Sequence, residues 1–152
     1  MLRTLPFGPS DSKLLIEESL LERLSTFRQV EGSAREAGGI LIGYRRGPHT
    51  HITECTVPSQ WDIRHRFGFF RHGTHHQRVA LRRWSETDRM LDYVGEWHTH
   101  PENDPTPSWT DVHHWRRISA ASKRPMILVI VGRAKNWIGA RLGESIRGTA
   151  GL

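Results

Sequence analysis

The chain of 152 residues has the length of one domain, and its 36% of hydrophobic residues is enough to form a packed core, which argues against intrinsic disorder. The formal charge of +6 comes from 22 lysines and arginines against 16 acidic residues, and only three of the basic residues are lysines. Such a charge bears on solubility and non-specific binding, so we do not expect nucleic acid as the main partner.

The first half of the chain predicts a helix followed by a β-hairpin. Apolar residues at helical spacing predict an amphipathic helix as the first element: Ile16, Leu20, Leu24 and Phe27. Residues 38–44 (GGILIGY) predict a strand, and the turn RRGPH returns the chain as a second strand through residues 52–57. Residues 61–73 lack clear periodicity and predict a loop with one short strand at Phe67–Phe70.

The second half predicts helices that alternate with strands. In chain order we expect a helix over Thr74–Arg89, a strand over Tyr93–His100, a helix that begins at Ser108, a buried strand over Met126–Val131 and a strand over Asn136–Leu142. The tail from Gly148 is rich in small residues and is expected to fray. This order predicts an α/β domain with helices packed on a mixed sheet.

The stretch GEWHTHPENDPTPSWTD carries the candidate chemistry. His98 and His100 are two residues apart on a predicted strand, so both side chains project from one face and can bind the same ion. The proline-rich loop that follows brings the start of the next helix, with Asp111, back toward the end of that strand. Two imidazoles and one carboxylate make a three-ligand site, which for zinc leaves a fourth position for water. A zinc ion there lowers the pKa of water to about 7, so these residues predict a catalytic metal.

A proton acceptor is the remaining requirement, and Glu36 is the candidate. It precedes a strand whose Gly38 and Gly39 allow close approach of another backbone, and we expect it to act as general base and then general acid. Structural alternatives remain open at this point. Ser108 and Asp111 also match the serine and acidic partner of a helix capping box, and Glu36 alone would suit a solvated strand end.

In this order and spacing the residues resemble the JAMM, or MPN-plus, metalloproteases, also called the JAB-domain family. The family pattern is a glutamate before a strand of small residues, then His-Ser/Thr-His-Pro, and then a serine, two further residues and an aspartate. Here these positions are filled by Glu36, by HTHP at 98–101, and by Ser108 and Asp111. The resemblance covers about residues 13–145 of a domain that we expect to span residues 1–152.

The resemblance implies a role for each matching residue. His98, His100 and Asp111 would bind Zn²⁺, Glu36 would activate the water, and Ser108 would help to stabilise the oxyanion. It also implies the JAB/MPN fold, a cytidine-deaminase-like α/β sandwich, which agrees with the predicted element order. The implied enzyme is a zinc metalloprotease with deubiquitinase-like isopeptidase activity. It would cleave after the C-terminus of a conjugated protein by direct attack of water, without an acyl-enzyme.

Within the family, the sequences GEWHTHPE and PTPS look most like bacterial JAMM proteins of anti-phage CBASS operons. Those proteins remove a cyclase-type nucleotidyltransferase (CD-NTase) from targets to which an E1/E2-like enzyme has joined it, which would place this chain in antiviral defence. Alternatives are a peptidase that processes ubiquitin-like or sulfur-carrier proteins, and the DNA-repair-associated JAB proteins. A non-catalytic JAB scaffold with a nucleic-acid-binding arginine surface is a further alternative, but a scaffold has no reason to keep the motif residues together.

We expect the substrate to present an extended C-terminal tail. Zinc ligands at a strand end, beside a sheet edge, can hold an extended chain through main-chain hydrogen bonds. The irregular segment 61–76 supplies basic and aromatic residues to border such a groove: Arg64, Arg66, Phe67, Phe69, Phe70 and Arg71. A solvated loop over a core aromatic is the alternative interpretation.

The other histidines give weaker signals. Three of them lack a nearby acidic ligand and suit a solvated or substrate-facing loop better than a second metal site: His72, His75 and His76. His113 and His114 are adjacent on a predicted helix, so at most one of them faces the metal pocket.

Two further residues complete the predictions. Glu96 should share the strand face of His98 and either support a ligating imidazole or face solvent. Cys55, the only cysteine, fits a small core residue in a reducing compartment and excludes an internal disulfide. With no apolar segment near the roughly 20 residues that span a bilayer and no secretory signal in the first residues, we expect a cytoplasmic protein without a membrane partner.

Overall fold

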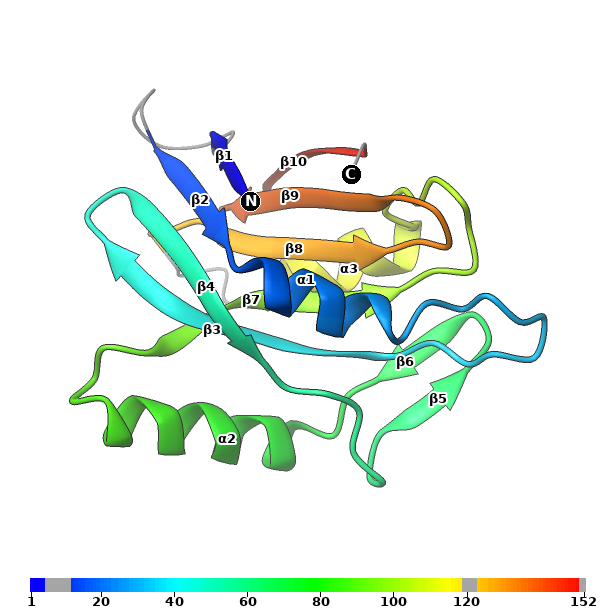
Figure 1. The fold of residues 1–152 in the computed structure, drawn as a ribbon, viewed down its shortest axis with the longest axis horizontal. Helices are drawn as coiled ribbons and strands as arrows, with labels where there is room; N and C mark the ends of the chain where they lie inside the picture. The colour runs from blue at the N-terminus through cyan, green and yellow to red at the C-terminus, as the bar shows by residue number, and fades with distance from the viewer. Residues whose placement is uncertain (5–11, 119–122, 151–152) are drawn as a thin grey trace.

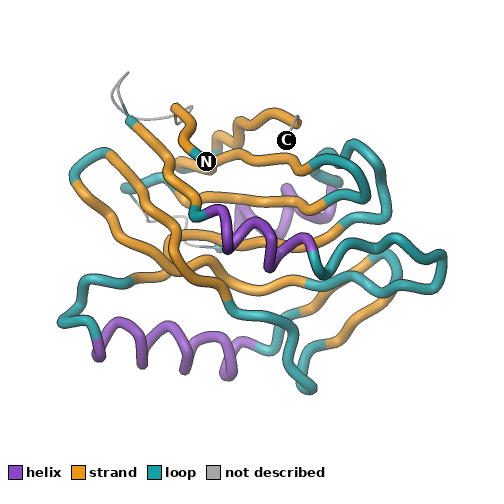
Figure 2. The backbone as a smooth tube through the Cα atoms, viewed as in Figure 1, coloured by secondary structure: helices purple, strands orange, loops and turns teal. Residues whose placement is uncertain are grey.

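The computed structural model describes residues 1–4, 12–118 and 123–150. These residues form ten strands and three helices, in chain order β1 Leu2–Thr4, β2 Lys13–Ile16, α1 Glu18–Ser25, β3 Gly38–Arg46, β4 His49–Cys55, β5 Ile63–His65, β6 Gly68–Phe70, α2 Gly73–Glu86, β7 Asp92–Thr99, α3 Trp109–Arg117, β8 Met126–Val131, β9 Asn136–Leu142 and β10 Ser145–Ala150. Eight strands make one mixed sheet in the order β1-β2-β4-β3-β7-β8-β9-β10, and β5 and β6 make a separate hairpin (Figures 1 and 2). The predicted mixed sheet flanked by helices is confirmed.

The centre of the sheet is strand β3, which pairs antiparallel with both β4 and β7. Strands β7 and β8 are parallel, and α3 lies in the connection between them. A parallel pair needs such a crossover, whereas β8, β9 and β10 are antiparallel and follow one another through short turns. The crossover therefore places the start of α3 beside the carboxyl end of β7.

Both faces of the sheet are covered, as the strictly apolar strand β8 requires. Alternate residues of β8 point to opposite faces: Ile127 and Val129 pack in the core cluster that contains Leu20 and Leu24 of α1. Leu128 packs on the other face, in the cluster formed around Trp115 of α3. In Figure 1, α1 lies in front of the sheet and α3 behind it.

The prediction of one helix from Ile16 to Phe27 as the first element is wrong. β1 comes first, Ile16 ends β2, and α1 is limited to Glu18–Ser25, so Phe27 lies beyond it. The apolar stripe is nevertheless real, because Ile16, Leu20 and Leu24 are all buried in one cluster against which Phe27 packs. The spacing of the apolar residues indicates that they share one core, but it does not locate the change from strand to helix.

The prediction that the tail frays from Gly148 is also wrong for the described residues. β10 pairs with β9, and Gly148 lies opposite Gly139. A Cβ at either glycine would come within 2.4 Å of the Trp137 ring, so the small residues make room for an indole. A composition typical of a loose tail here serves close packing.

The predicted elements between these two regions are confirmed in type. The β3–β4 hairpin, α2, β7, α3, β8 and β9 are all present, with ends that differ by a few residues. The segment predicted as a loop with one short strand contains two short strands, β5 and β6. None of the helices in the described residues has the length and apolar character that crossing a membrane requires.

Candidate metal centre

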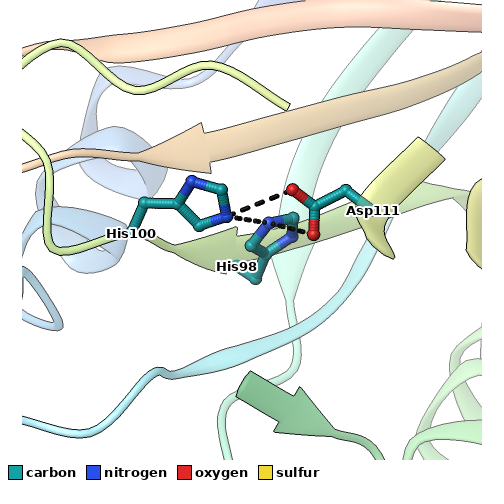
Figure 3. Close-up of side chains that lie close together, drawn as sticks. All are labelled: His98, His100 and Asp111. Atoms are coloured by element: carbon teal, nitrogen blue, oxygen red, sulfur yellow. Dashed lines mark hydrogen bonds and ion pairs between the residues drawn. The ribbon is translucent and has the colours of Figure 1, made fainter. Parts of the chain in front are cut away.

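The carboxyl end of β7 and the start of α3 bring together His98, His100 and Asp111 (Figure 3). His98 lies in β7 and His100 directly follows it, and both rings face the same side because they are two residues apart in extended chain. Both histidines are buried, with 8% and 6% of their surface exposed. The group borders a cavity of about 550 Å³.

The donor atoms of these three residues have the separations that one small cation needs. The two Nε2 atoms are 3.0 Å apart, and each lies 3.2 Å from one Asp111 oxygen, His98 from Oδ1 and His100 from Oδ2. A tetrahedral zinc ion at its usual distances of 2.0–2.2 Å keeps its ligand atoms about 3.3 Å apart. Two imidazole nitrogens and the Asp111 carboxylate group therefore suit a single zinc ion.

Asp111 is held in place by the local structure of the helix start. Ser108 is the N-cap of α3, and its Oγ accepts a hydrogen bond from the Asp111 amide at 3.1 Å. The Asp111 Oδ2 accepts one in return from the Ser108 amide at 2.7 Å, which completes a capping box. The capping alternative and the ligand prediction are thus compatible, because the same carboxylate faces both the helix end and the histidines.

The electrostatics of the group favour an ionised carboxylate. Burial acts to raise the pKa of Asp111, but the hydrogen bonds from His100 and His98 outweigh it and hold that pKa well below its usual value. For His100, burial acts to lower the pKa, and the hydrogen bond to Asp111 raises it above the ordinary value. The site concentrates negative charge beside basic imidazoles, and a cation can replace the proton that they share.

Glu36 borders the same cavity, two residues before β3, and only 6% of it is exposed. Burial raises its pKa to about 7; His100 acts against this shift, while Asp111 and Glu102 add to it. A carboxyl group with a pKa near neutrality is suited to accept and return a proton. The solvated strand end considered from the sequence is therefore wrong.

The glycines that follow Glu36 allow the close approach expected of them. A Cβ on Gly38 would lie 2.6 Å from the Phe69 ring and 2.8 Å from the Trp97 carbonyl oxygen. A Cβ on Gly39 would lie 2.4 Å from the Thr56 carbonyl oxygen. Strand β3 therefore packs against β7 and against β6 with no room for a side chain at these positions.

Glu96 is buried on β7, but it contacts neither His98 nor His100, the two imidazoles predicted to bind the metal. Its Oε1 accepts hydrogen bonds from Arg71 at 2.6 Å and Tyr93 at 3.0 Å, and His114 lies 3.5 Å from its Oε2. Both sequence interpretations are therefore wrong, since the carboxylate is neither solvent-exposed nor a partner of His98. Of the adjacent pair on α3, His114 is the one that borders the metal cavity.

The histidine-rich segment contains a buried residue, His76, so the expectation that this histidine is solvated or faces the substrate is wrong. His76 is fully buried on α2, 2.5 Å from the Thr56 Oγ1 and 2.9 Å from Asp62. Among the described residues, only His98, His100 and Asp111 form a group suited to a metal ion, so no second site forms at His76. Cys55 packs against the core, where burial raises the pKa of its thiol to about 11.

The β5–β6 hairpin forms one wall of the metal cavity. Residues 66–71 border the cavity, and Phe67 and Phe70 are 76% and 58% exposed. Arg64 differs from the prediction, because its guanidinium donates hydrogen bonds to the backbone of Arg35 and Glu36 instead of facing the cavity. The segment is therefore an ordered hairpin beside the candidate site, with two exposed aromatic rings.

Comparisons with known proteins agree with this geometry. Residues 17–142 match the family described as prokaryotic homologs of the JAB domain. A CD-NTase/cGAS isopeptidase of Escherichia coli is 39% identical over 90% of this chain and 87% of its own length, and one of Vibrio cholerae is 40% identical with the same coverage. A solution structure of a Desulfitobacterium hafniense protein has the same fold, with a TM-score of 0.64 and 17% identity over 89% of this chain and 88% of that one. The chain belongs to the prokaryotic JAB-domain family.

Proposed function

We propose that this protein is a zinc-dependent isopeptidase that cleaves after the C-terminus of a conjugated protein. The observation that carries the proposal is the convergence of His98, His100 and Asp111 beside a buried glutamate of raised pKa, Glu36, in one open cavity. Metal ligands and a proton acceptor in one site are the parts of a metal-assisted hydrolase.

Each proposed role follows from where the group lies. When bound, zinc supplies a Lewis acid that polarises the scissile carbonyl and lowers the pKa of water. Glu36 accepts the proton that the water loses as its oxygen bonds to the carbonyl carbon, and returns it to the nitrogen as the C–N bond breaks. The Ser108 Oγ accepts a hydrogen bond from the Asp111 amide. The hydroxyl hydrogen of Ser108 is therefore left to donate a hydrogen bond to the carbonyl oxygen of the scissile bond.

The substrate we propose is a CD-NTase whose C-terminus has been joined to a target by an E1/E2-like enzyme. The Escherichia coli and Vibrio cholerae relatives match most of this chain, and their name, CD-NTase/cGAS isopeptidase, supports a CD-NTase as the conjugated protein. The open cavity beside β6 suits an extended tail, and the exposed rings of Phe67 and Phe70 suit apolar side chains of that tail. This activity would place the protein in anti-phage defence.

A tail fusion tests the activity. We expect the wild-type protein with zinc to cut a fusion of a CD-NTase C-terminal tail to a fluorescent reporter once, directly after the last tail residue, as mapped by mass spectrometry. Glu36→Gln should keep its metal and lose about 10²–10⁴-fold in rate, because a proton acceptor is removed and no ligand is. Scattered cuts in unfolded proteins, with the tail fusion intact, would make the protein a general peptidase.

Metal analysis tests the ligand set separately. We expect one zinc ion per wild-type chain after dialysis, and substantially less in His100→Ala, because the variant removes one of three protein ligands. His113→Ala is the matched control, since its ring stacks on exposed Trp109 and lies outside the metal group. Equal zinc in wild type and His100→Ala would contradict the assignment.

A further inference from the structure

The β5–β6 hairpin is bonded directly to the backbone of Glu36. The Glu36 amide donates a hydrogen bond to the His65 carbonyl at 2.7 Å, and the Arg64 Nε donates one to the Glu36 carbonyl at 2.6 Å. Both polar groups of the Glu36 backbone are therefore held by β5. A displacement of the hairpin would therefore displace the backbone that carries the Glu36 carboxyl group.

Gln29 joins this hairpin to the strand that carries the histidines. Its side chain is 1% exposed, and its Nε2 donates to the carbonyl oxygens of Ala34 at 3.0 Å and Arg66 at 2.9 Å. Its Oε1 accepts from the Thr99 hydroxyl at 2.9 Å, and Thr99 lies between the two histidines. That hydroxyl oxygen also accepts the amide of Ala37, the residue after Glu36, at 2.9 Å. One buried amide thus bonds the segment before Glu36, the hairpin turn and β7.

Asp62 holds the other end of the hairpin. β5 begins one residue after Asp62 and β6 ends two residues before His72, and the Asp62 Oδ1 accepts the His72 amide at 2.7 Å. Its Oδ2 accepts the Ser59 amide at 2.7 Å and lies 2.9 Å from the His76 Nε2. The side chains of Asp62 and His76 are both fully buried, and the His76 Nδ1 contacts the Thr56 Oγ1 on the strand side. A single carboxylate therefore closes the base of the hairpin and ties it to α2.

We infer that the β5–β6 hairpin is a fixed brace that sets the position of Glu36 relative to the metal ligands, and that Gln29 and Asp62 are its positioning residues. The inference rests on the proposed function, in which Glu36 transfers the proton. Neither positioning residue borders the cavity of the candidate site. Each holds the β5–β6 hairpin, to which the backbone of Glu36 is hydrogen-bonded. Small displacements of a catalytic group can reduce rates about 10²-fold.

The kinetic test uses variants of similar shape, each of which loses at least one of these hydrogen bonds. Gln29→Met should lower kcat on the tail fusion about 10–100-fold, with KM and zinc content unchanged, because only the geometry of Glu36 is altered. Asp62→Asn keeps one acceptor oxygen but replaces the other with an NH2 group, which cannot accept an amide hydrogen bond, so it should lower kcat in the same direction. Gln60→Met and Asp88→Asn are matched controls at exposed positions and should keep the wild-type kcat.

A double-mutant cycle separates positioning from general loss of structure. In the Glu36→Gln background, Gln29→Met should reduce the residual rate less than twofold, because the group that it positions is already gone. An equal loss in both backgrounds, a loss confined to KM, or a loss of zinc would overturn the brace.

Hydrogen exchange tests the brace independently of catalysis. Gln29→Met should speed exchange of the Glu36 and Ala37 amides at least tenfold and leave the β8 amides unchanged, because the opening is local. Uniformly faster exchange, or no change at Glu36, would contradict the inference. If the wild type does not cut the fusion, the proposed function fails, and the exchange result still decides whether the hairpin holds Glu36.

Discussion

Glu36 is a buried carboxyl group whose surroundings favour its neutral form. Its folded pKa of about 7 lies above the ordinary value of 4.5, and burial is the main cause. Below pH 4.5 the group is protonated in both folded and unfolded chains, so the shift has no effect there. Between pH 4.5 and about 7 the unfolded chain is ionised more fully than the folded one, so the free energy of unfolding falls as the pH rises, and it levels off above the folded pKa, where the group is ionised in both.

Glu36→Gln should therefore stabilise the metal-free protein at alkaline pH. We expect a gain of about 2–3 kcal/mol in the free energy of unfolding at pH 8 and a gain below about 1 kcal/mol at pH 5. Urea unfolding of both proteins in chelator at the two pH values measures it. Equal stability at pH 8 would mean that the Glu36 carboxylate is solvated.

Ser108 combines a structural and a proposed catalytic role that substitution can separate. Ser108→Ala should lose about 1 kcal/mol of stability as a missing cap, whereas Ser108→Gly should lose only a few tenths. Both should lose rate to a similar extent, on the order of 10²-fold, if the hydroxyl donates to the oxyanion. Thermal melts and kcat on the tail fusion measure the two effects, and a rate loss that follows stability would leave only the cap.

Four of the predicted site residues have a fixed local spacing. His98 and His100 are two residues apart at the end of β7, and Ser108 and Asp111 lie at the first turn of α3, so local geometry relates each pair before any fold is known. Gln29 has no such signature, because two of its three partners, Arg66 and Thr99, come from distant segments that only the fold brings to it. The buried ion pair of Glu96 has no local signature for the same reason, because its partner Arg71 lies outside β7.

Helix α3 is held at both ends by groups outside its regular hydrogen bonding. Ser108 and Asp111 satisfy its start, and at its other end the guanidinium of Arg141 donates to the carbonyl oxygens of Arg116 and Ile118. Arg141 is only 2% exposed and lies on β9, so it fixes the end of the helix to the sheet.

Arg141→Met should lower the free energy of unfolding by about 2–4 kcal/mol, because it removes a buried side chain and leaves two partly buried carbonyl groups without their donor. Zinc content should stay at one per chain, since the ligand on α3 lies at the opposite end. Denaturant unfolding and metal analysis measure the two quantities. Arg78→Met, at an exposed position on α2, is the control and should change neither.

The elements most clearly predicted are those whose pattern has one physical cause. The apolar run of β8 can only be buried on both faces, and the turn after β3 returns the chain as a hairpin. The spacing predicts a helix at Ile16 because this strand residue is buried in the same core as the helix and stands at a helical interval before Leu20. The three-residue strands β5 and β6 are too short to show alternation, and they are fixed by Asp62 and Gln29 instead.

At the scale of the whole molecule, the proposed metal joins the sheet to the crossover helix. A ligand that binds only the folded chain stabilises it by about 2.7 kcal/mol at a free concentration 100 times its dissociation constant. For a chain of this length we therefore expect zinc to raise Tm by about 5–10 °C. Calorimetry with zinc and with chelator measures the shift, and His100→Ala should melt at one temperature in both. A zinc effect of equal size in that variant would place the bound ion elsewhere.

The proposed metal ligands are close together in the sequence, whereas the proposed general base, Glu36, is far from them. The proposed ligands lie within residues 98–111, whereas Glu36 stands 62 positions before His98 and meets them only when β3 pairs with β7. Closing the longer loop costs about 1.4 kcal/mol more in chain entropy. During folding, the ligands can therefore gather around an ion before the general base arrives. A chain in which β3 has not paired with β7 would lack Glu36 beside the proposed metal ligands, so the proposed proton transfer requires that pairing.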